Sequence, residues 1–196
     1  SSGTINSLSD NNVWAVIPDR KGNIWAGTSV GLNRYDKKTG KFKIFRHDKN
    51  DQSSLISDMV ISLWIDMAGM LWVGTTEGLC QFNPATEKFV PYVNKVSIDM
   101  KDENIIWSVN GDSSGRIFTG TNNGAYALDP TTKVFTPLLK SDSRNNTVVW
   151  SVFAGQNGIL WAGTAQGLYR IRPADGCYDL FRHQSGDIQS LSDDNV

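Results

Sequence analysis

The chain has 196 residues, of which 39% are hydrophobic and 20% are charged, and this balance excludes disordered, collagen-like and coiled-coil proteins. Its 19 basic and 20 acidic side chains give a formal net charge of -1, so the charge expected of a general nucleic-acid binder is absent and no polyanion partner is indicated. The apolar runs are far shorter than the roughly 18 residues of a membrane helix, so we expect no membrane contact by this segment itself.

The first elements in chain order are short strands separated by turns. Each apolar segment is either continuous or alternates with period two, and each ends at Gly, Asp, Asn or Thr, which is typical of strands and turns. The strands expected between residues 13 and 45 are 13–17, 24–28, 31–35 and 42–45. Turns are expected at residues 19–22 and 36–40, and no helix is predicted.

This pattern occurs four times. In every copy an aromatic residue is followed by x-Gly-Thr, and another Gly stands three residues after the Thr. The aromatic residues are Trp25, Trp72, Phe118 and Trp161. Four short strands in a repeat of about 45 residues predict an all-β fold built from β-propeller blades of four antiparallel strands. The expected blades are 13–45, 60–92, 106–138 and 149–181, within one propeller segment over residues 1–196.

The first strand of each repeat is expected to be innermost, where neighbouring blades converge. It has small residues at equivalent positions, namely Ala15, Ser62, Ser108 and Ser151. Residues 1–12 and 183–195 are expected to be the same inter-blade loop, so that the chain adds no extra strand to its four blades. A blade face left uncovered would form an apolar patch, which favours a homodimer or other self-association through open blade edges.

The repeat resembles the two-component regulator propeller repeat. The resemblance is carried by Asp-x-x-Gly, Ile-Trp-x-Gly-Thr, Gly-Leu, a Tyr-Asp turn and Phe-x-x-Phe, as in residues 19–45. That family forms the extracytoplasmic sensor region of bacterial hybrid histidine kinases, typically as seven-bladed propellers. The resemblance implies a fragment of such a propeller, in the periplasmic part of an inner-membrane protein, that senses a carbohydrate or oligosaccharide without catalysis. Three positions depart from the pattern, namely Phe118, Ala125 and Gly155.

Candidate ligand-binding residues lie near the turns where the inner strands begin. Indole rings there could stack on sugar rings, with burial as the competing interpretation. The amide and carboxylate groups of nearby loops suit hydroxyl-rich ligands, although unconstrained sequence drift would look the same. The aromatic candidates are Trp14, Trp107 and Trp150. The polar candidates are Glu77, Asn122, Asn123, Asn145, Asn146 and Gln166.

Three repeated carboxylates raise the alternative of a propeller glycoside hydrolase or lyase. They are Asp19, Asp66 and Asp112, each three residues before a Gly. At that position an Asp side chain usually accepts backbone hydrogen bonds within a turn, so we expect a structural role and no catalytic residue. The repeated tryptophans Trp25, Trp72 and Trp161 are expected in the core. A protein-interaction scaffold is the third interpretation.

The sequence predicts no metal site and no cofactor. His47 and His183 occupy equivalent places after a strand and have no supporting Cys or Asp cluster, so zinc ligation is not expected. Cys80 and Cys177 lack metal-site spacing, and both are expected to be free, buried thiols.

Overall fold

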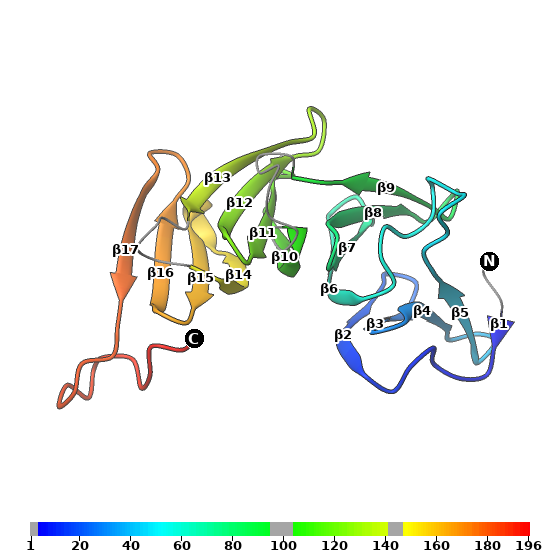
Figure 1. Ribbon diagram of the computed structural model, residues 1–196, viewed down its shortest axis with the longest axis horizontal. Coiled ribbons are helices and arrows are strands. Elements are labelled where there is room, and N and C mark those ends of the chain that lie inside the picture. The colour runs from blue at the N-terminus through cyan, green and yellow to red at the C-terminus, as the bar shows by residue number, and fades with distance from the viewer. Residues whose placement is uncertain (1–3, 95–103, 141–146) are drawn as a thin grey trace. The chain divides into compact units, whose positions relative to one another are not determined.

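The computed structural model is all-β over the residues that it describes, which are 4–94, 104–140 and 147–196. Four antiparallel sheets follow one another along the chain (Figure 1), each with four consecutive strands hydrogen-bonded in sequence order. A short 3-10 turn, Gln156–Gly158, lies between two strands of the last sheet. The predicted architecture of four repeats with four antiparallel strands is therefore confirmed.

The strand bounds agree closely with the predicted repeats. The first sheet contains β2 (Val13–Pro18), β3 (Ile24–Thr28), β4 (Gly31–Asp36) and β5 (Lys41–Phe45). The second contains β6 (Val60–Ile65), β7 (Leu71–Thr75), β8 (Leu79–Asn83) and β9 (Lys88–Tyr92). The third contains β10 (Ile106–Gly111), β11 (Ile117–Thr121), β12 (Gly124–Asp129) and β13 (Val134–Lys140). The fourth contains β14 (Val149–Ala154), β15 (Leu160–Thr164), β16 (Gly167–Arg172) and β17 (Cys177–Phe181).

One strand was not expected. β1 (Thr4–Ile5) pairs antiparallel with the outer strand β5, with Thr4 opposite Lys43 and Ile5 opposite Phe42. The prediction that residues 1–12 add no strand to the blades is therefore wrong. β5 is an edge strand with unpaired backbone groups, and β1 satisfies part of that edge.

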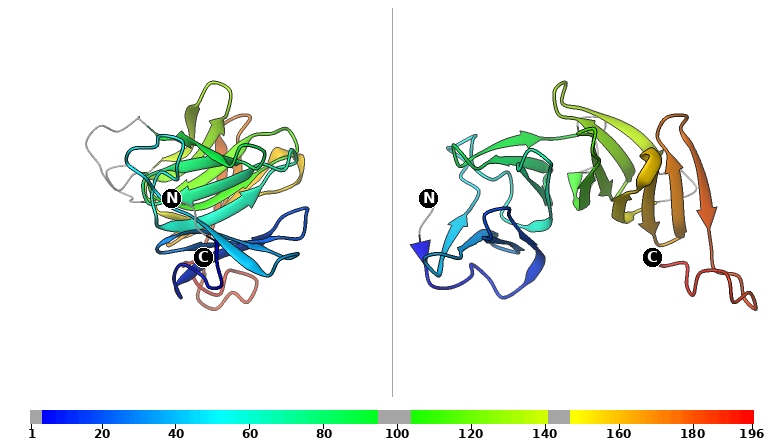
Figure 2. Two further views of the ribbon diagram at one scale, coloured as in Figure 1. Left: turned by 90° about the vertical axis from the view of Figure 1, so that its right-hand side faces the viewer. Right: turned by 180° about the vertical axis from the view of Figure 1, so that it is seen from behind.

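The chain divides into two compact units, Ser1–Ile106 and Trp107–Val196. Figure 2 shows the ribbons of both units from two further sides. In the first unit an aromatic cluster joins the first two sheets, with Trp25 and Phe82 ring centroids 5.0 Å apart and Phe45 and Phe82 centroids 5.1 Å apart. In the second unit Phe118, Leu160 and Ile171 belong to one core cluster. The repeated aromatic residue is thus buried in the first three sheets and half-buried, as Trp161, in the fourth.

The Gly of x-Gly-Thr lets neighbouring sheets approach closely. A Cβ atom added to Gly27 would lie 2.5 Å from Cγ1 of Val60, the first residue of β6. In the second unit, a Cβ atom added to Gly120 would lie 2.7 Å from the carbonyl oxygen of Val149, the first residue of β14. Real Cβ atoms do not approach so closely, so this repeat position requires glycine for packing.

Two polar side chains of β10, the small residue Ser108 and the larger Asn110, contact the first strand of the next sheet in the second unit. The Ser108 hydroxyl accepts a hydrogen bond from the Val152 backbone N–H at 3.1 Å, and Asn110 Oδ1 accepts one from the Ala154 N–H at 3.2 Å. These bonds join the first strands of the third and fourth sheets. In the part of the chain that the structure describes, no helix is long and apolar enough to cross a membrane.

Candidate functional site

The four short turns between the second and third strands have one common geometry. In each, the Thr hydroxyl donates a hydrogen bond to the carbonyl oxygen of the Gly three residues later. It also accepts a hydrogen bond from the backbone N–H of the residue directly before that Gly. In the third sheet these distances are 3.0 Å from Thr121 to Gly124 and 3.0 Å from Asn123 to Thr121. The equivalent Thr-to-Gly distances in the first, second and fourth sheets are 2.9, 2.8 and 2.8 Å. The backbone of the turn is therefore fixed without help from its two middle side chains.

The first strands of three sheets carry a β-bulge next to these turns. The pairing register shifts between Val13 and Ala15, between Val60 and Ser62, and between Val149 and Ser151. The residues at the bulges are Trp14, Ile61 and Trp150. A bulge leaves its extra residue unpaired and redirects its side chain, so two of the predicted tryptophans stand at positions where the strand departs from regular pairing.

Two of the tryptophans bond to the adjacent turn. Trp14 Nε1 donates to the Ser29 hydroxyl at 3.0 Å, and Trp107 Nε1 donates to Asn122 Oδ1 at 2.6 Å. Ser29 and Asn122 occupy the same place, directly after the Thr of the turn. At the third tryptophan, Trp150, the equivalent turn residue is Ala165, whose side chain has no acceptor.

The second unit brings three predicted residues into direct contact. The rings of Trp107 and Trp150 meet edge to face, with centroids 5.1 Å apart and planes at 63°, and Trp107 holds Asn122 through the bond described above. We call Trp107, Trp150 and Asn122 the tryptophan cluster. Trp150 is 41% exposed, whereas Trp107 is half-buried.

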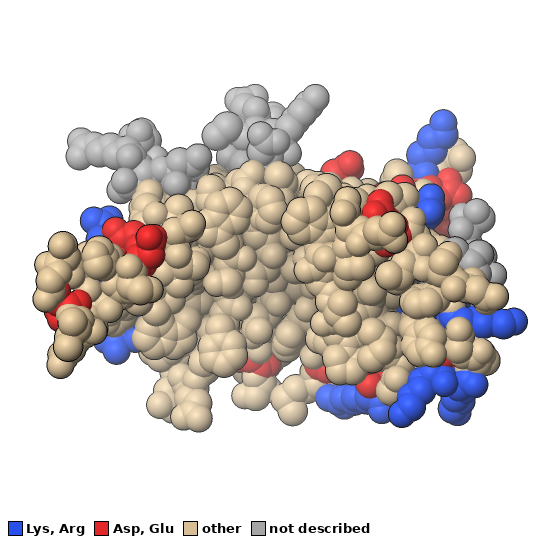
Figure 3. Space-filling model, turned by 90° about the horizontal axis from the view of Figure 1, so that it is seen from below, with Lys and Arg blue, Asp and Glu red and all other residues tan. Residues whose placement is uncertain are grey.

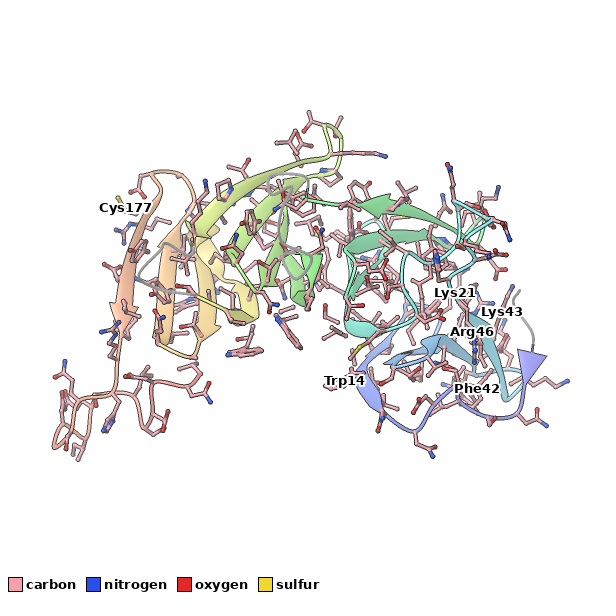
Figure 4. The ribbon with its side chains drawn as sticks, in the orientation of Figure 1. Trp14, Lys21, Phe42, Lys43, Arg46 and Cys177 are labelled. Carbon is pink, nitrogen blue, oxygen red and sulfur yellow. The ribbon has the colours of Figure 1, made fainter. Side chains whose placement is uncertain are left out.

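The remaining predicted residues lie in several places. Asn123 and Gln166 are the second middle residues of their turns in the second unit, and Gln166 Oε1 is buried with no hydrogen-bond donor among the described residues. Trp14 is half exposed and lies on β2 in the first unit (Figure 4). Glu77 is an exposed turn residue of the second sheet. Asn145 and Asn146 lie outside the described residues.

One residue next to the turns was missed by the sequence reasoning. Arg182 Nε donates to the Gln166 carbonyl oxygen at 3.2 Å and thereby links β17 to the turn. Arg182 stands in Phe-Arg-His, which also occurs at residues 45–47, so its recurrence was the available signal.

The repeated aspartates have the structural role that was expected. Asp19 Oδ1 accepts the Lys21 and Asn23 N–H groups at 2.8 and 2.9 Å, and its Oδ2 accepts Trp25 Nε1 at 3.2 Å. Burial alone would raise the pKa of Asp19, but hydrogen bonds from Asn23 and Trp25 outweigh it and hold that pKa below its ordinary value. These hydrogen bonds make the Asp19 carboxylate part of the turn.

The third sheet keeps this turn although its aromatic residue is Phe118. Arg116 Nε donates to Asp112 Oδ2 at 2.7 Å, and its guanidinium lies 5.4 Å from the centre of the Phe118 ring. Arg116 thus replaces the missing indole N–H. In the fourth sheet the turn Asp is Gly155, and the 3-10 turn Gln156–Gly158 closes the hairpin instead.

The two histidines stabilise equivalent inter-blade loops. His47 Nδ1 lies 2.8 Å from the Leu55 carbonyl oxygen, and the His47 N–H donates to Asp58 Oδ1 at 2.7 Å. His183 makes the matching contacts with Leu191 at 2.6 Å and with Asp194 at 2.6 Å. Among the described residues, no group of three or more His, Cys, Asp or Glu side chains is arranged to hold a metal ion.

Comparison with known proteins agrees with the repeat pattern. Residues 7–30 match the family described as two component regulator propeller. Residues 7–30 are thus similar to a two-component regulator propeller repeat. The resemblance inferred from the sequence is therefore confirmed at this repeat, whose match includes the Asp19 turn and Trp25. No curated protein matches the chain significantly in sequence.

Solved structures share the fold of this repeat protein. The chain is similar to the extracellular domain assigned to the hybrid two-component system BT4673 of B. thetaiotaomicron, with a TM-score of 0.81 and 22% identity over 96% of this chain. It spans 25% of that chain. It is also similar to virginiamycin B lyase from Staphylococcus aureus, with a TM-score of 0.70 and 12% identity over 95% of this chain and 61% of the other. At these identities the likeness establishes the propeller fold alone.

Proposed function

We propose that this chain is a non-catalytic, ligand-binding propeller segment in the periplasmic sensor region of a hybrid two-component histidine kinase. The observation that carries the proposal is the match of residues 7–30 to the two-component regulator propeller family. The likeness in fold to the extracellular domain assigned to BT4673 supports it. Because the chain spans only a quarter of that domain's chain, the membrane and kinase parts of the proposed protein are part of the proposal.

We further propose that the ligand is a carbohydrate or oligosaccharide, bound at the tryptophan cluster. The exposed indole of Trp150 offers an apolar face for a sugar ring. The Asn122 oxygen is bonded to Trp107 and the Gln166 oxygen is buried. The NH2 groups of these two amides, with the Asn123 amide, are therefore the proposed contacts for ligand hydroxyl groups. The fixed turn backbone holds these amides in place before the ligand arrives, so that less conformational entropy is lost on binding.

Signalling at such a site requires a difference in affinity between two arrangements of the sensor. A ligand that binds both arrangements equally tightly changes neither population. The proposed signal is therefore the preferential binding of the oligosaccharide to one arrangement of a sensor dimer.

Isothermal titration calorimetry with a panel of plant and host oligosaccharides tests the proposal. We expect at least one neutral oligosaccharide to bind, and Trp150→Ala to weaken it about three- to tenfold, as expected for the loss of an aromatic stacking contact of about 0.5–1.5 kcal/mol. Phe153→Ala is the matched control, because Phe153 is also on β14 and is 62% exposed but lies outside the cluster.

Two results would contradict the proposal. If no oligosaccharide of the panel binds, the chain is not a direct carbohydrate sensor. If Trp150→Ala and Phe153→Ala weaken binding equally, the ligand does not bind at the tryptophan cluster.

A lyase or hydrolase is the alternative, since virginiamycin B lyase shares the fold. That alternative needs reactive side chains that the fold itself does not occupy. The carboxylates of Asp19, Asp66 and Asp112 accept hydrogen bonds from their own turns, and His47 and His183 are bonded within their loops. These bonds favour the binding role over catalysis.

A further inference from the structure

The near-zero net charge of the chain conceals an uneven distribution. Residues 13–45, the first sheet, contain seven basic and two acidic side chains, whereas residues 60–92, the second sheet, contain one basic and three acidic side chains. The basic residues of the first sheet are Arg20, Lys21, Arg34, Lys37, Lys38, Lys41 and Lys43. The positive charge is therefore concentrated on one sheet.

Four of these cations gather at one end of the first sheet. Arg20 and Lys21 are on the turn between β2 and β3, and Lys37 and Lys38 are on the turn between β4 and β5, all four of them exposed. Antiparallel pairing places both turns at the same end, and Lys37 Cδ lies 3.5 Å from the point where a Cβ atom of Gly22 would stand. We call these four residues the basic turn surface.

Asp19 and Asp36 stand in the same two turns as these cations, but their carboxylates accept hydrogen bonds from backbone N–H groups of the turns. Arg34 and Lys43 of the same sheet form ion pairs with Glu87, but within the described residues none of the four turn cations has such a partner. Figure 3 shows Lys and Arg side chains gathered over the first sheet. Lys21 is labelled in Figure 4.

A recess adjoins this surface within the first unit. A pocket of about 270 Å³ lies between the turn at residues 19–22 and the equivalent turn of the second sheet. Arg20, Lys21 and Arg34 line it together with Asp19, whose carboxylate is bonded within its own turn. Arg20 Nη2 donates to the Met67 carbonyl oxygen at 2.8 Å, which holds its guanidinium beside the pocket. The surface thus combines exposed cations with a hollow that can admit an acidic group.

We propose that the basic turn surface binds an acidic polysaccharide through its carboxylate or sulfate groups. Lys and Arg bind such groups through charge and, for Arg, through paired hydrogen bonds. Single-stranded nucleic acid fits less well, because neither turn carries an aromatic ring on which a base would stack. A flat anionic membrane could contact the exposed turn cations but would not enter the pocket, whereas an acidic group of a polysaccharide chain could do so.

This surface is separate from the site of the proposed function. The basic turn surface lies at the opposite end of its strands from the Thr-x-x-Gly turns, and the tryptophan cluster belongs to the other unit. The two proposals therefore succeed or fail independently.

Titration of the chain with heparin, polygalacturonate and neutral dextran, at low and physiological ionic strength, tests the inference. We expect both acidic polysaccharides to bind, more weakly at the higher ionic strength, and dextran not to bind. The variant Lys21→Gln/Lys37→Gln/Lys38→Gln should bind about tenfold more weakly, because three exposed ion-pair contacts are removed. The control Lys49→Gln/Lys88→Gln/Lys140→Gln removes the same charge from exposed positions elsewhere and should change binding by less than about twofold.

Thermal unfolding monitored by circular dichroism establishes that both variants fold, and vesicles of phosphatidylglycerol and duplex DNA complete the comparison. Equal weakening in the two variants would overturn the proposal, because only net charge would then matter. Absence of binding to both acidic polysaccharides would also overturn it. Binding to the vesicles or to DNA as tight as to the polysaccharides would reassign the surface to that partner.

Discussion

The Trp72 indole Nε1 donates a hydrogen bond to Asp66 Oδ2 at 3.0 Å. Trp72 is almost completely buried, and Asp66 Oδ1 accepts the Met70 N–H in the same turn. One carboxylate therefore orders a surface turn and accepts the hydrogen bond of a buried indole N–H group, as Asp19 does in the first sheet. This shared role accounts for the turn Asp and the Trp in the first two repeats, whereas the third has the Asp with Phe118 and the fourth has Trp161 with Gly155.

Loss of this carboxylate should destabilise the protein. We expect Asp66→Ala to lower the free energy of unfolding by about 1–3 kcal/mol, because the buried indole N–H is left without an acceptor. Urea unfolding followed by tryptophan fluorescence measures the change. Adding Asp66→Ala to a Trp72→Phe background should cost clearly less, because the unpaired donor is gone. Strictly additive effects would show that the bond does not couple the two residues.

The close approach of Gly27 and Val60 predicts a steric effect. Gly27→Ala should lower the free energy of unfolding by about 1–3 kcal/mol, because the new methyl group would overlap the Val60 side chain. The penalty should shrink when Val60 is also replaced by Ala, although Val60→Ala is itself destabilising. Urea unfolding of the two single variants and the double variant tests this. An unchanged penalty in the Val60→Ala background would disprove the assigned contact.

Glu87 predicts a contribution of stability that depends on pH. Its hydrogen bond from Lys43, together with Arg34, holds the pKa of Glu87 below its ordinary value. The folded state therefore binds a proton at Glu87 less readily than the unfolded state. The stabilisation is present above the ordinary Glu pKa of about 4.3 and is lost as the pH falls through the lowered value.

The matched variant for this effect is Glu87→Gln. We expect the urea midpoint of the parent to fall more between neutral and acidic pH than that of Glu87→Gln. Other carboxylates with lowered pKa values, such as Asp19 and Asp112, will make both proteins less stable in acid. Parallel pH profiles would show that Glu87 contributes nothing.

The two cysteines should differ sharply in reactivity. Cys177 is exposed, whereas Cys80 is buried and its burial raises the pKa of its thiol to about 12. Because the thiolate is the reactive form, we expect one thiol to react rapidly with a maleimide in native buffer and two in denaturant. Mass spectrometry after proteolysis identifies the labelled residue. Rapid native labelling of Cys80 would contradict its burial.

Self-association through open blade edges remains our proposal. Val16 on β2 is 62% exposed, whereas its repeat equivalent Val152 is 6% exposed, and Phe181 is 40% exposed against 6% for Phe45. We expect sedimentation velocity to detect concentration-dependent association that Val16→Asp weakens. Val134→Asp, at an exposed valine that begins β13, should have no such effect. A monomer at all concentrations would end the proposal.

The sequence predicted the strands and the Asp turns well, because the repeat shows each element four times. A position that is always Gly, as Gly27 and its equivalents are, indicates a backbone constraint even before the neighbouring Val60 is seen. The expectation of no catalytic role for Asp19 also rested on the repeat. An Asp that recurs at the same position in three repeats is explained by the turn that all three repeats form.

Features that occur once were harder to predict. The contact between Trp107 and Trp150 is made at one place in the second unit, and nothing in the local sequence marks the bulge at which Trp150 stands. β1 comprises only two residues and has no repeat equivalent among the predicted strands. Cys177 was expected to be buried, but it begins β17 beside an exposed turn, so its position in the repeat did not determine its exposure.

The hydroxyl of Thr121 bonds to both ends of its turn, so the backbone of the turn does not depend on which two side chains stand between Thr121 and Gly124. The two middle positions of such a turn can therefore differ between repeats while the backbone is kept, as Ser29, Thr76, Asn122 and Ala165 show at the first of them. The same property makes these dipeptides convenient sites for randomisation in the laboratory, where libraries at four turns would share one unchanged framework.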